Sequence, residues 1–430
     1  MKKLLSLLLA LVMVTGIFAS CSDKDDDKDK LIKELEERIE ELEEKEDEKE
    51  DDKEEDKEAA DGTEETSGEV DENDDEDEFY PISHYAYKNT EYFIGATGPL
   101  TGGASSYGIS VLYGAMLAIE EINAAGGLNG VKFKFDMKDD QAAADKASTA
   151  YDQLFEAGMQ ISLGSVTSGS CAAFAAKAAK DNLFFMTPSA SAEVCIEEPN
   201  AFRVCYGDPQ QGVLAAEELA AKYKNIGVIY DESDYYSVGI FEAFAEQMRW
   251  LGINYKVKTF DAENNRNFTA QVEALKDCDV IFLPIYYTEA GLIAKQVAKS
   301  NDTTVLFGCD GLDGIAGQID ETVKNPIGYI TPFDVNSTDE KVVKFVKAYE
   351  ANYGTKPDQF AADGYDAVMA IYEAMKMAGV DDVTIAPSAL CDMVVKVVTS
   401  DDFSYAGLTG DMAWDKSGAA DKTPIIVFLQ

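Results

Sequence analysis

Three short segments place hydroxyl groups or a carboxylate just after a predicted strand. Ser165–Ser170 (SVTSGS) precedes a helix predicted to start near Cys171, where hydroxyls and free backbone N–H groups suit an anion. Thr187–Ser191 (TPSAS) is the second segment, and Phe307–Gly311 carries Asp310. Because a buried charge needs a partner, donors for an anion and a carboxylate for a cation together suit a small molecule with both charges.

Each segment also has a plainer interpretation. Ser168 or Ser170 can be a helix N-cap, and Thr187–Ser191 can be an ordinary Pro/Ser turn. Asp310 can likewise cap a helix, and Asp313 is close enough to compete for either role.

The elements that position these segments alternate between strand-like and helix-like runs. Amphipathic helical stretches are predicted at Ile109–Ala125, Ala142–Ala157, Gln211–Tyr223 and Phe241–Leu251, and Thr338–Ser400 is mostly helical. Strand-like runs are Tyr92–Thr97, Val131–Met137, Ile161–Ser165, Leu183–Thr187, Phe202–Tyr206, Ile226–Tyr230, Tyr255–Phe260, Val280–Ile285, Val305–Gly308, Ile327–Pro332 and Thr423–Leu429. This pattern predicts an α/β protein with two Rossmann-like lobes, each a parallel sheet flanked by helices, whose facing strand ends form a cleft.

Charge is distributed unevenly along the 430 residues. The formal net charge is −44, and residues 22–80 hold 33 acidic and 9 basic side chains. Such a run repels itself and favours an extended linker, although Ile32, Leu35, Ile39 and Leu42 would allow a short coiled coil. The acidic surface argues against nucleic acid and anionic lipid as partners.

Histidine and cysteine usage excludes several classes of site. His84 is the only histidine, so neither a Ser–His–Asp nor a Cys–His catalytic apparatus, nor a histidine zinc site, can be built in the body. The seven cysteines show no CxxC spacing, which argues against a metal knuckle. Cys195 and Cys205 either form a disulfide or are small buried apolar residues.

No enzyme signature appears, and we expect neither a cofactor nor a metal. Asp139 and Asp140 are adjacent on a strand, so their side chains point to opposite faces and do not form an acid–base pair. The glycine-rich run Gly95–Gly103 lacks the Lys-Ser/Thr of a phosphate-binding loop.

One long stretch resembles the branched-chain amino-acid-binding proteins of ABC transporters, the Leu/Ile/Val-binding family. The resemblance covers almost all of residues 90–430. It rests on Ile94–Gly102 (IGATGPLTG), Tyr107-Gly108, Gly114-Ala115 and Ala118–Gly130 (AIEEINAAGGLNG), then Asp139-Asp140, Gly164–Ser170, Thr187–Ala192, Tyr236–Gly239 and Gly407–Gly418. It implies a type I periplasmic-binding (Venus-flytrap) fold, with lobes joined by hinge strands, that hands an amino acid to a membrane permease.

The resemblance also implies roles for individual residues. Ser168 binds the ligand carboxylate, the carbonyl of Ser189 accepts from the ammonium, and Ser191 contacts both groups. Asp310 pairs with the ammonium, where comparable members carry Glu. Val166 and Tyr107 contact the ligand side chain. The full set of candidate binding residues is Tyr107, Val166, Thr167, Ser168, Ser189, Ser191, Tyr236, Tyr286, Asp310 and Phe360. Tyr235 and Tyr287 leave the register open by one at two of these positions.

The N-terminus has the layout of an export signal. Lys2 and Lys3 precede the apolar run Leu4–Phe18, and Ala19-Ser20-Cys21 follows. This resembles a bacterial lipobox, which implies cleavage before Cys21 and lipid attachment to it; the alternative is an ordinary signal peptide in which the cysteine is incidental.

The predicted organisation is therefore a signal peptide at 1–20, a lipidated cysteine with an acidic linker at 21–85, and a binding domain at 86–430. Lobe 1 takes about 90–208 and 334–418, and lobe 2 takes about 209–333 and 419–430. We expect a monomeric, extracytoplasmic, membrane-anchored receptor for a branched-chain or other apolar amino acid, on a Gram-positive surface or in a periplasm. The alternatives are a sensory receptor that works through a partner protein, and transport of a short amide or urea.

Overall fold

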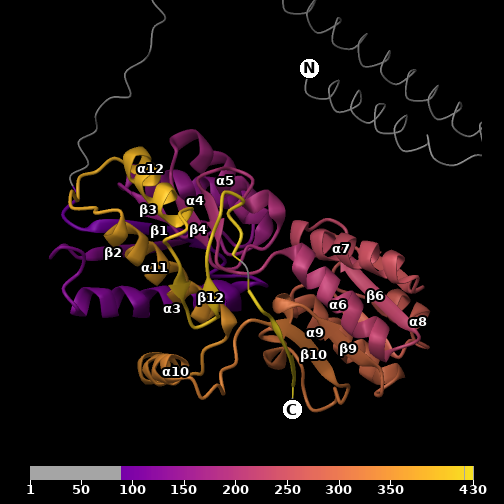
Figure 1. The fold of residues 1–430 in the computed structure, drawn as a ribbon. Coiled ribbons are helices and arrows are strands. Elements are labelled where there is room, and N and C mark those ends of the chain that lie inside the picture. The colour runs from indigo at the N-terminus through magenta and orange to yellow at the C-terminus, as the bar shows by residue number, and fades with distance from the viewer. Residues whose placement is uncertain (1–88, 421, 430) are drawn as a thin grey trace, which may run out of the picture. The chain divides into compact units, whose positions relative to one another are not determined.

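The computed structural model describes residues 89–420 and 422–429 (Figure 1). The predicted signal peptide, Cys21, the acidic linker and His84 lie outside these residues. Within them, no helix is long and apolar enough to cross a membrane. Nor does the described part of the chain contain a group of three or more His, Cys, Asp or Glu residues that could hold a metal ion.

The first lobe is built on a five-stranded parallel sheet of order β2-β1-β3-β4-β5. Its strands are β1 (Tyr92–Gly98), β2 (Phe133–Asp139), β3 (Ile161–Ser162), β4 (Phe185–Thr187) and β5 (Ala201–Arg203). Its helices are α3 (Ser105–Ala124), α4 (Ala144–Glu156), α5 (Ser168–Asp181), α10 (Glu340–Tyr353), α11 (Gln359–Met377) and α12 (Pro387–Val398). A short antiparallel pair, β11 (Tyr405–Ala406) and β12 (Asp411–Met412), follows α12.

The second lobe is built on a six-stranded sheet of order β13-β10-β9-β8-β6-β7, in which only β13 runs antiparallel. Its strands are β6 (Ile226–Asp231), β7 (Lys256–Phe260), β8 (Val280–Leu283), β9 (Val305–Gly308), β10 (Ile327–Thr331) and β13 (Ile425–Phe428). Its helices are α6 (Asp208–Lys222), α7 (Tyr235–Leu251), α8 (Thr269–Ala274) and α9 (Tyr287–Ser300). Figure 1 shows the helices of each lobe around its own sheet.

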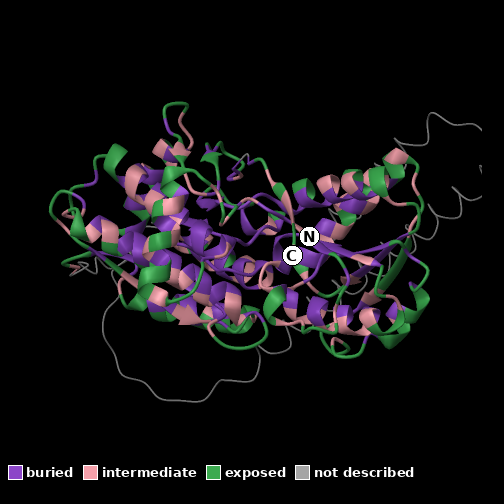
Figure 2. Ribbon diagram, turned by 90° about the horizontal axis from the view of Figure 1, so that it is seen from below, coloured by how far each residue is buried: buried purple, intermediate pink, exposed green. Residues whose placement is uncertain are grey.

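The alternation of side chains along β1 explains why helices cover both faces of the first sheet. Tyr92, Ile94 and Ala96 pack in one apolar cluster with α3 and α11, whereas Phe93 packs in another with α4 and α5. All seven residues of β1 are buried, as expected for a central parallel strand. Figure 2 shows buried residues in the strands and on the inward faces of the helices around them. The prediction of two helix-flanked, essentially parallel sheets is thus confirmed.

Two predicted helix starts need correction, and one open alternative is settled. The helix expected near Cys171 starts at Ser168, and the helix expected from Phe241 starts at Tyr235, because Asp234 caps it by accepting from the N–H of Ser237 at 3.1 Å. Cys195 and Cys205 are not bonded to each other, and both are buried free thiols. The simple apolar interpretation of these cysteines therefore holds.

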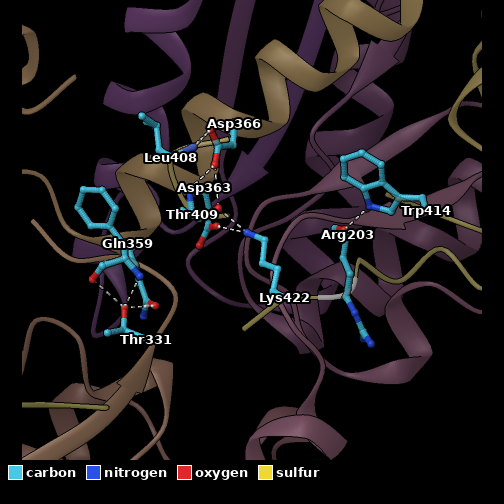
Figure 3. Close-up of polar contacts among 10 residues, drawn as sticks. Arg203, Thr331, Gln359, Asp363, Asp366, Leu408, Thr409, Trp414 and Lys422 are labelled. Atoms are coloured by element: carbon cyan, nitrogen blue, oxygen red, sulfur yellow. Dashed lines mark hydrogen bonds and ion pairs between the residues drawn. The ribbon is translucent and has the colours of Figure 1, made fainter. Parts of the chain in front are cut away.

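The chain passes between the lobes three times: after β5, after β10 and after β12. Trp414 Nε1 donates to the carbonyl of Arg203 at 2.8 Å, which joins the first and third passages (Figure 3). Thr331 Oγ1 donates a hydrogen bond to Gln359 Oε1 at 2.9 Å. This bond fixes the second passage to the start of α11. In the third passage, Lys422 extends its amino group into the first lobe.

The close contact between α3 and α11 depends on a glycine. A Cβ at Gly114 would lie 1.9 Å from the carbonyl oxygen of Ala361, which is backbone and cannot swing away. We expect Gly114→Ala to lower the free energy of unfolding by about 2 kcal/mol, because the two helices must separate. Urea denaturation measures this. Gly169→Ala, also within a helix but with no atom inside 4 Å, is the matched control and should not destabilise the protein. Equal stability of both variants would contradict the close packing.

Candidate functional site

A small cavity lies where the carboxyl ends of the two sheets face each other. Its remaining space is about 10 Å³, close to what one water molecule needs. The residues that line it come from both lobes: Tyr107, Val166, Thr167, Ser168, Ser189, Tyr236, Tyr286, Asp310, Gly311 and Phe360. Nine of these ten are positions proposed from the sequence; Gly311 is the addition.

The N-terminus of α5 forms one wall. Its N-cap, Thr167, has an extended backbone, and no side chain caps the helix. The first N–H groups of a helix lack partners within the helix and carry a partial positive charge. Ser168 sits at this end, where its Oγ accepts from the N–H of Ala192 at 3.3 Å and keeps its own proton to donate. This wall is suited to a carboxylate.

The loop after β4 supports the same wall. Ser189 lines the cavity, and its hydroxyl donates to the carbonyl of Val166 at 2.7 Å, which leaves its own carbonyl as the group to offer a ligand. Ser191 does not line the cavity. Its carbonyl instead accepts from Arg203 Nη1 at 2.8 Å and from the N–H of Asp208 at 3.1 Å. Its position therefore departs from the direct contact that the resemblance implied.

Asp310 supplies the negative charge on the opposite wall. Its Oδ1 accepts from the hydroxyl of Tyr236 at 2.7 Å and from the N–H of Gly311 at 2.9 Å. Burial raises the pKa of Asp310 to about 7, and the hydrogen bond from Tyr236 opposes this shift. Asp313 lies outside the cavity, where it accepts from Tyr329 and from the N–H of Gln359. Asp310, and not Asp313, therefore lines the cavity.

Aromatic rings form the rest of the lining. The rings of Tyr236 and Tyr286 are stacked with their centroids 4.9 Å apart, and the ring centroids of Tyr107 and Phe360 are 4.4 Å apart. Tyr235 is 58% exposed, so the cavity position in α7 belongs to Tyr236. The flat rings offer apolar surface, and the hydroxyls of Tyr107 and Tyr236 bond to the backbone of Gly311.

The two lobes are in direct contact across the cavity. The hydroxyl of Tyr107 donates to the carbonyl of Gly311 at 2.5 Å and accepts from the N–H of Tyr287 at 3.0 Å. At the rim, Thr288 Oγ1 donates to the carbonyl of Gly103 at 2.6 Å. These bonds join the first lobe to the second, so the structure represents a closed cleft.

Two glutamines behind Asp310 were not anticipated from the sequence. Gln211 Oε1 accepts from the N–H of Asp310 at 3.1 Å, and Gln359 Nε2 donates to its carbonyl at 2.8 Å. They lie 99 and 49 residues away along the chain, so no local motif announces them. Both fix the backbone on which the carboxylate stands.

The arrangement separates two kinds of charge. One wall presents hydroxyls and a helix N-terminus for an anion, and the other presents a buried carboxylate for a cation. Because nearly all of these groups are buried, they would interact strongly with a ligand that replaces water in the cleft. The groups around the cavity therefore match the two charges of a small zwitterion, and the lobes must part to admit one, because the closed form leaves space for only about one water molecule.

The chain is similar to known proteins over most of its described residues. Residues 91–420 match the family model described as periplasmic binding protein. The Leu/Ile/Val-binding protein BraC3 of Rhizobium johnstonii is 29% identical over 239 residues, which cover 54% of this chain and 64% of that relative. The chain thus spans slightly less than two thirds of that relative's length.

Two solved structures share the fold over most of the described residues. The substrate-binding protein LivJ of Streptococcus pneumoniae, solved with isoleucine, is 28% identical, with a TM-score of 0.70 over 78% of this chain and 95% of that one. The leucine-binding protein LivK of Thermotoga maritima is 25% identical, with a TM-score of 0.70 over 78% of this chain and 94% of that one.

Proposed function

Because the chain belongs to the periplasmic binding protein family, we propose that it captures an amino acid outside the cytoplasm and delivers it to the permease of an ABC importer. The observation that carries this proposal is the cavity between Ser168 at the start of α5 and Asp310 of the second lobe. The similarity of the chain to proteins named for leucine, isoleucine and valine supports a branched-chain or other small amino acid as cargo.

The proposed cycle starts with the cleft open. The ligand carboxylate binds at Ser168 and the α5 N–H groups, and its ammonium reaches the carbonyl of Ser189. Asp310, Tyr236 and Tyr286 then close over the ligand from the second lobe. Closure is a shift of population towards a state with extra contacts, and the Tyr107–Gly311 bond is one of these. The closed form is the one that docks on the permease.

The N-terminal segment would hold this receptor at the membrane. We propose that Cys21 is lipidated and that the acidic linker lets the domain stand off from the bilayer, as at a Gram-positive surface. Incorporation of a labelled fatty acid into the wild-type chain but not into Cys21→Ser tests the anchor. Labelling of both chains would show that the lipid is attached at another residue. Labelling of neither chain would contradict the proposed lipid anchor.

A thermal-shift screen tests the function. The full-length chain in detergent is melted with each common amino acid and with a few amides. A compound that binds only the folded state must raise the melting temperature. A rise with one or more amino acids is expected. A rise with amides alone would keep the fold but overturn the cargo, and no rise with any compound would overturn the function.

Binding should weaken as the pH falls below 7. In the closed form without ligand, Asp310 holds a proton up to about pH 7, because burial raises the pKa of this carboxyl. An ammonium ligand needs the ionised form, so below pH 7 its binding must expel the proton, and affinity should fall about tenfold per pH unit. Titration calorimetry at pH 6, in two buffers of different ionisation enthalpy, should show release of nearly one proton. Constant affinity from pH 5.5 to 8 would contradict the role of Asp310.

A further inference from the structure

The hydroxyl of Thr167 is a buried polar group that the proposed capture of carboxylate and ammonium leaves unused. Thr167 lines the cavity and is only 4% exposed. Its Oγ1 has no hydrogen-bond partner within the described part of the chain, and it does not cap α5 although it occupies the N-cap position. A buried hydroxyl without a partner is unfavourable, so its presence in a binding cavity needs an explanation.

The two serine hydroxyls that line the cavity on this wall differ from Thr167, whereas Ser170 Oγ and Ser191 Oγ, which also have no partner among the described residues, do not line the cavity. Ser189 Oγ donates to the carbonyl of Val166, and Ser168 Oγ accepts from the N–H of Ala192. Both are held by the backbone that they support. A ligand atom is the natural partner for the remaining hydroxyl, because the lining residues supply none.

Next to Thr167 the wall is apolar and cannot retreat. A Cβ placed on Gly98 would lie 2.7 Å from Val166 Cγ2, so the valine is packed directly on the end of β1. The rings of Tyr107 and Phe360, with centroids 4.4 Å apart, close the cavity further. This part of the lining therefore offers an apolar contact beside the one lining hydroxyl of this wall that has no partner.

From this pairing we propose that the cargo is a small amino acid with a hydroxyl on a branched side chain, as in threonine, and that Thr167 Oγ1 bonds that hydroxyl. The inference rests on the proposed function and narrows it. An apolar side chain of the same shape would leave Thr167 unpaired, and a site whose polar group is left unpaired rejects such an analogue. Valine, which has a methyl where threonine has the hydroxyl, is that analogue.

Titration calorimetry of the full-length chain with L-threonine and L-valine tests the proposal. The two ligands share their charged groups and nearly share their shape, so their ratio isolates the side-chain contact. We expect L-threonine to bind at least about tenfold more tightly. In Thr167→Val the preference should vanish or reverse, because threonine then meets a methyl. Thr167→Ser keeps the hydroxyl and should keep the preference, and thermal melts of both variants check that they fold.

Three outcomes would overturn the proposal. Tighter binding of L-valine by the wild-type chain removes the side-chain hydroxyl as the recognised group, while the amino-acid receptor itself stands. Equal weakening of both ligands in Thr167→Val would show that this hydroxyl serves the common carboxylate. Absence of binding for these two and for every other amino acid would remove the proposed function as well, so the two failures are distinguishable.

Discussion

Asp310→Asn is expected to lower the affinity for the amino-acid ligand more than a hundredfold without unfolding the protein. Removing one partner of a buried, hydrogen-bonded charge pair costs about 3 kcal/mol, which corresponds to that loss. The asparagine oxygen can still accept from Tyr236 and from the N–H of Gly311, so the loop keeps its bonds. Calorimetric titration of the variant, in parallel with its thermal melt, measures both effects.

The stability of the ligand-free variant separates lost binding from lost folding. The pKa of Asp310 in the folded protein is about 7, above its ordinary value of 3.8. The folded state therefore binds more protons than the unfolded state between these values, and the ionised carboxyl lowers stability as the pH rises. At pH 8 Asp310→Asn removes this penalty, so its melting temperature should equal or exceed that of the wild type.

Asp313→Asn is the matched control. This carboxyl is three residues further along the same loop and is bonded to Tyr329 and to the backbone of Gln359, outside the cavity. Its replacement should change affinity less than about threefold, as expected for a group that does not touch the ligand. Loss of binding in Asp313→Asn with normal binding in Asp310→Asn would make Asp313 the partner of the ammonium.

Local sequence patterns were sufficient to predict the layers but not the pairings between distant segments. The strand-like run of β1 and the helical periods around it are patterns of a few neighbouring residues, so both sheets could be predicted. The final strand was also recognised, yet its antiparallel pairing with β10 depends on where the third passage returns. The helical pattern predicts a helix only from Phe241, whereas α7 starts at Tyr235, where the side chain of Asp234 caps it.

Among the residues around the cavity, too, those with a local sequence signal could be predicted and those placed by distant contacts could not. Residues at strand ends, such as Ser168 and Asp310, carry a sequence signal because parallel strands present their carboxyl ends at one edge. Gln211 has no such signal, since its contact with Asp310 forms only when α6 packs beside the loop after β9. Ser191 has the expected residue type but does not line the cavity, and its carbonyl accepts a hydrogen bond from the guanidinium of Arg203. The structure reveals such non-local contacts, and residue type alone does not.

The third passage between the lobes contains a buried ion pair that the sequence does not announce. Lys422 Nζ lies 3.2 Å from Asp363 Oδ1 on α11, and both side chains are almost fully buried. The amino group also bonds Thr409 Oγ1, and Thr409 in turn donates to Asp366 at 2.7 Å (Figure 3). The pair therefore fixes the first-lobe end of the passage that leads to β13.

Lys422→Met should lower the free energy of unfolding by about 3–5 kcal/mol at pH 8, because it leaves Asp363 buried without its cation. Burial already raises the pKa of Asp363 to about 6, and Lys422 is the main group that opposes this shift. Without the lysine the folded-state pKa rises further above the unfolded value, so the variant should lose stability as the pH rises and be least impaired near pH 5. Urea denaturation at pH 5 and pH 8 measures the difference.

Adding Asp363→Asn to Lys422→Met should restore part of the stability at pH 8, since one of the two buried carboxylates that Lys422 compensates, Asp363 and Asp366, is then neutral. Lys416→Met removes an exposed lysine from the same passage and should change stability by less than about 0.5 kcal/mol. If Lys422→Met were as stable as this control at both pH values, the ion pair would not hold the passage. If the double variant were no more stable than Lys422→Met, the packing of the lysine stem rather than its charge would be what matters.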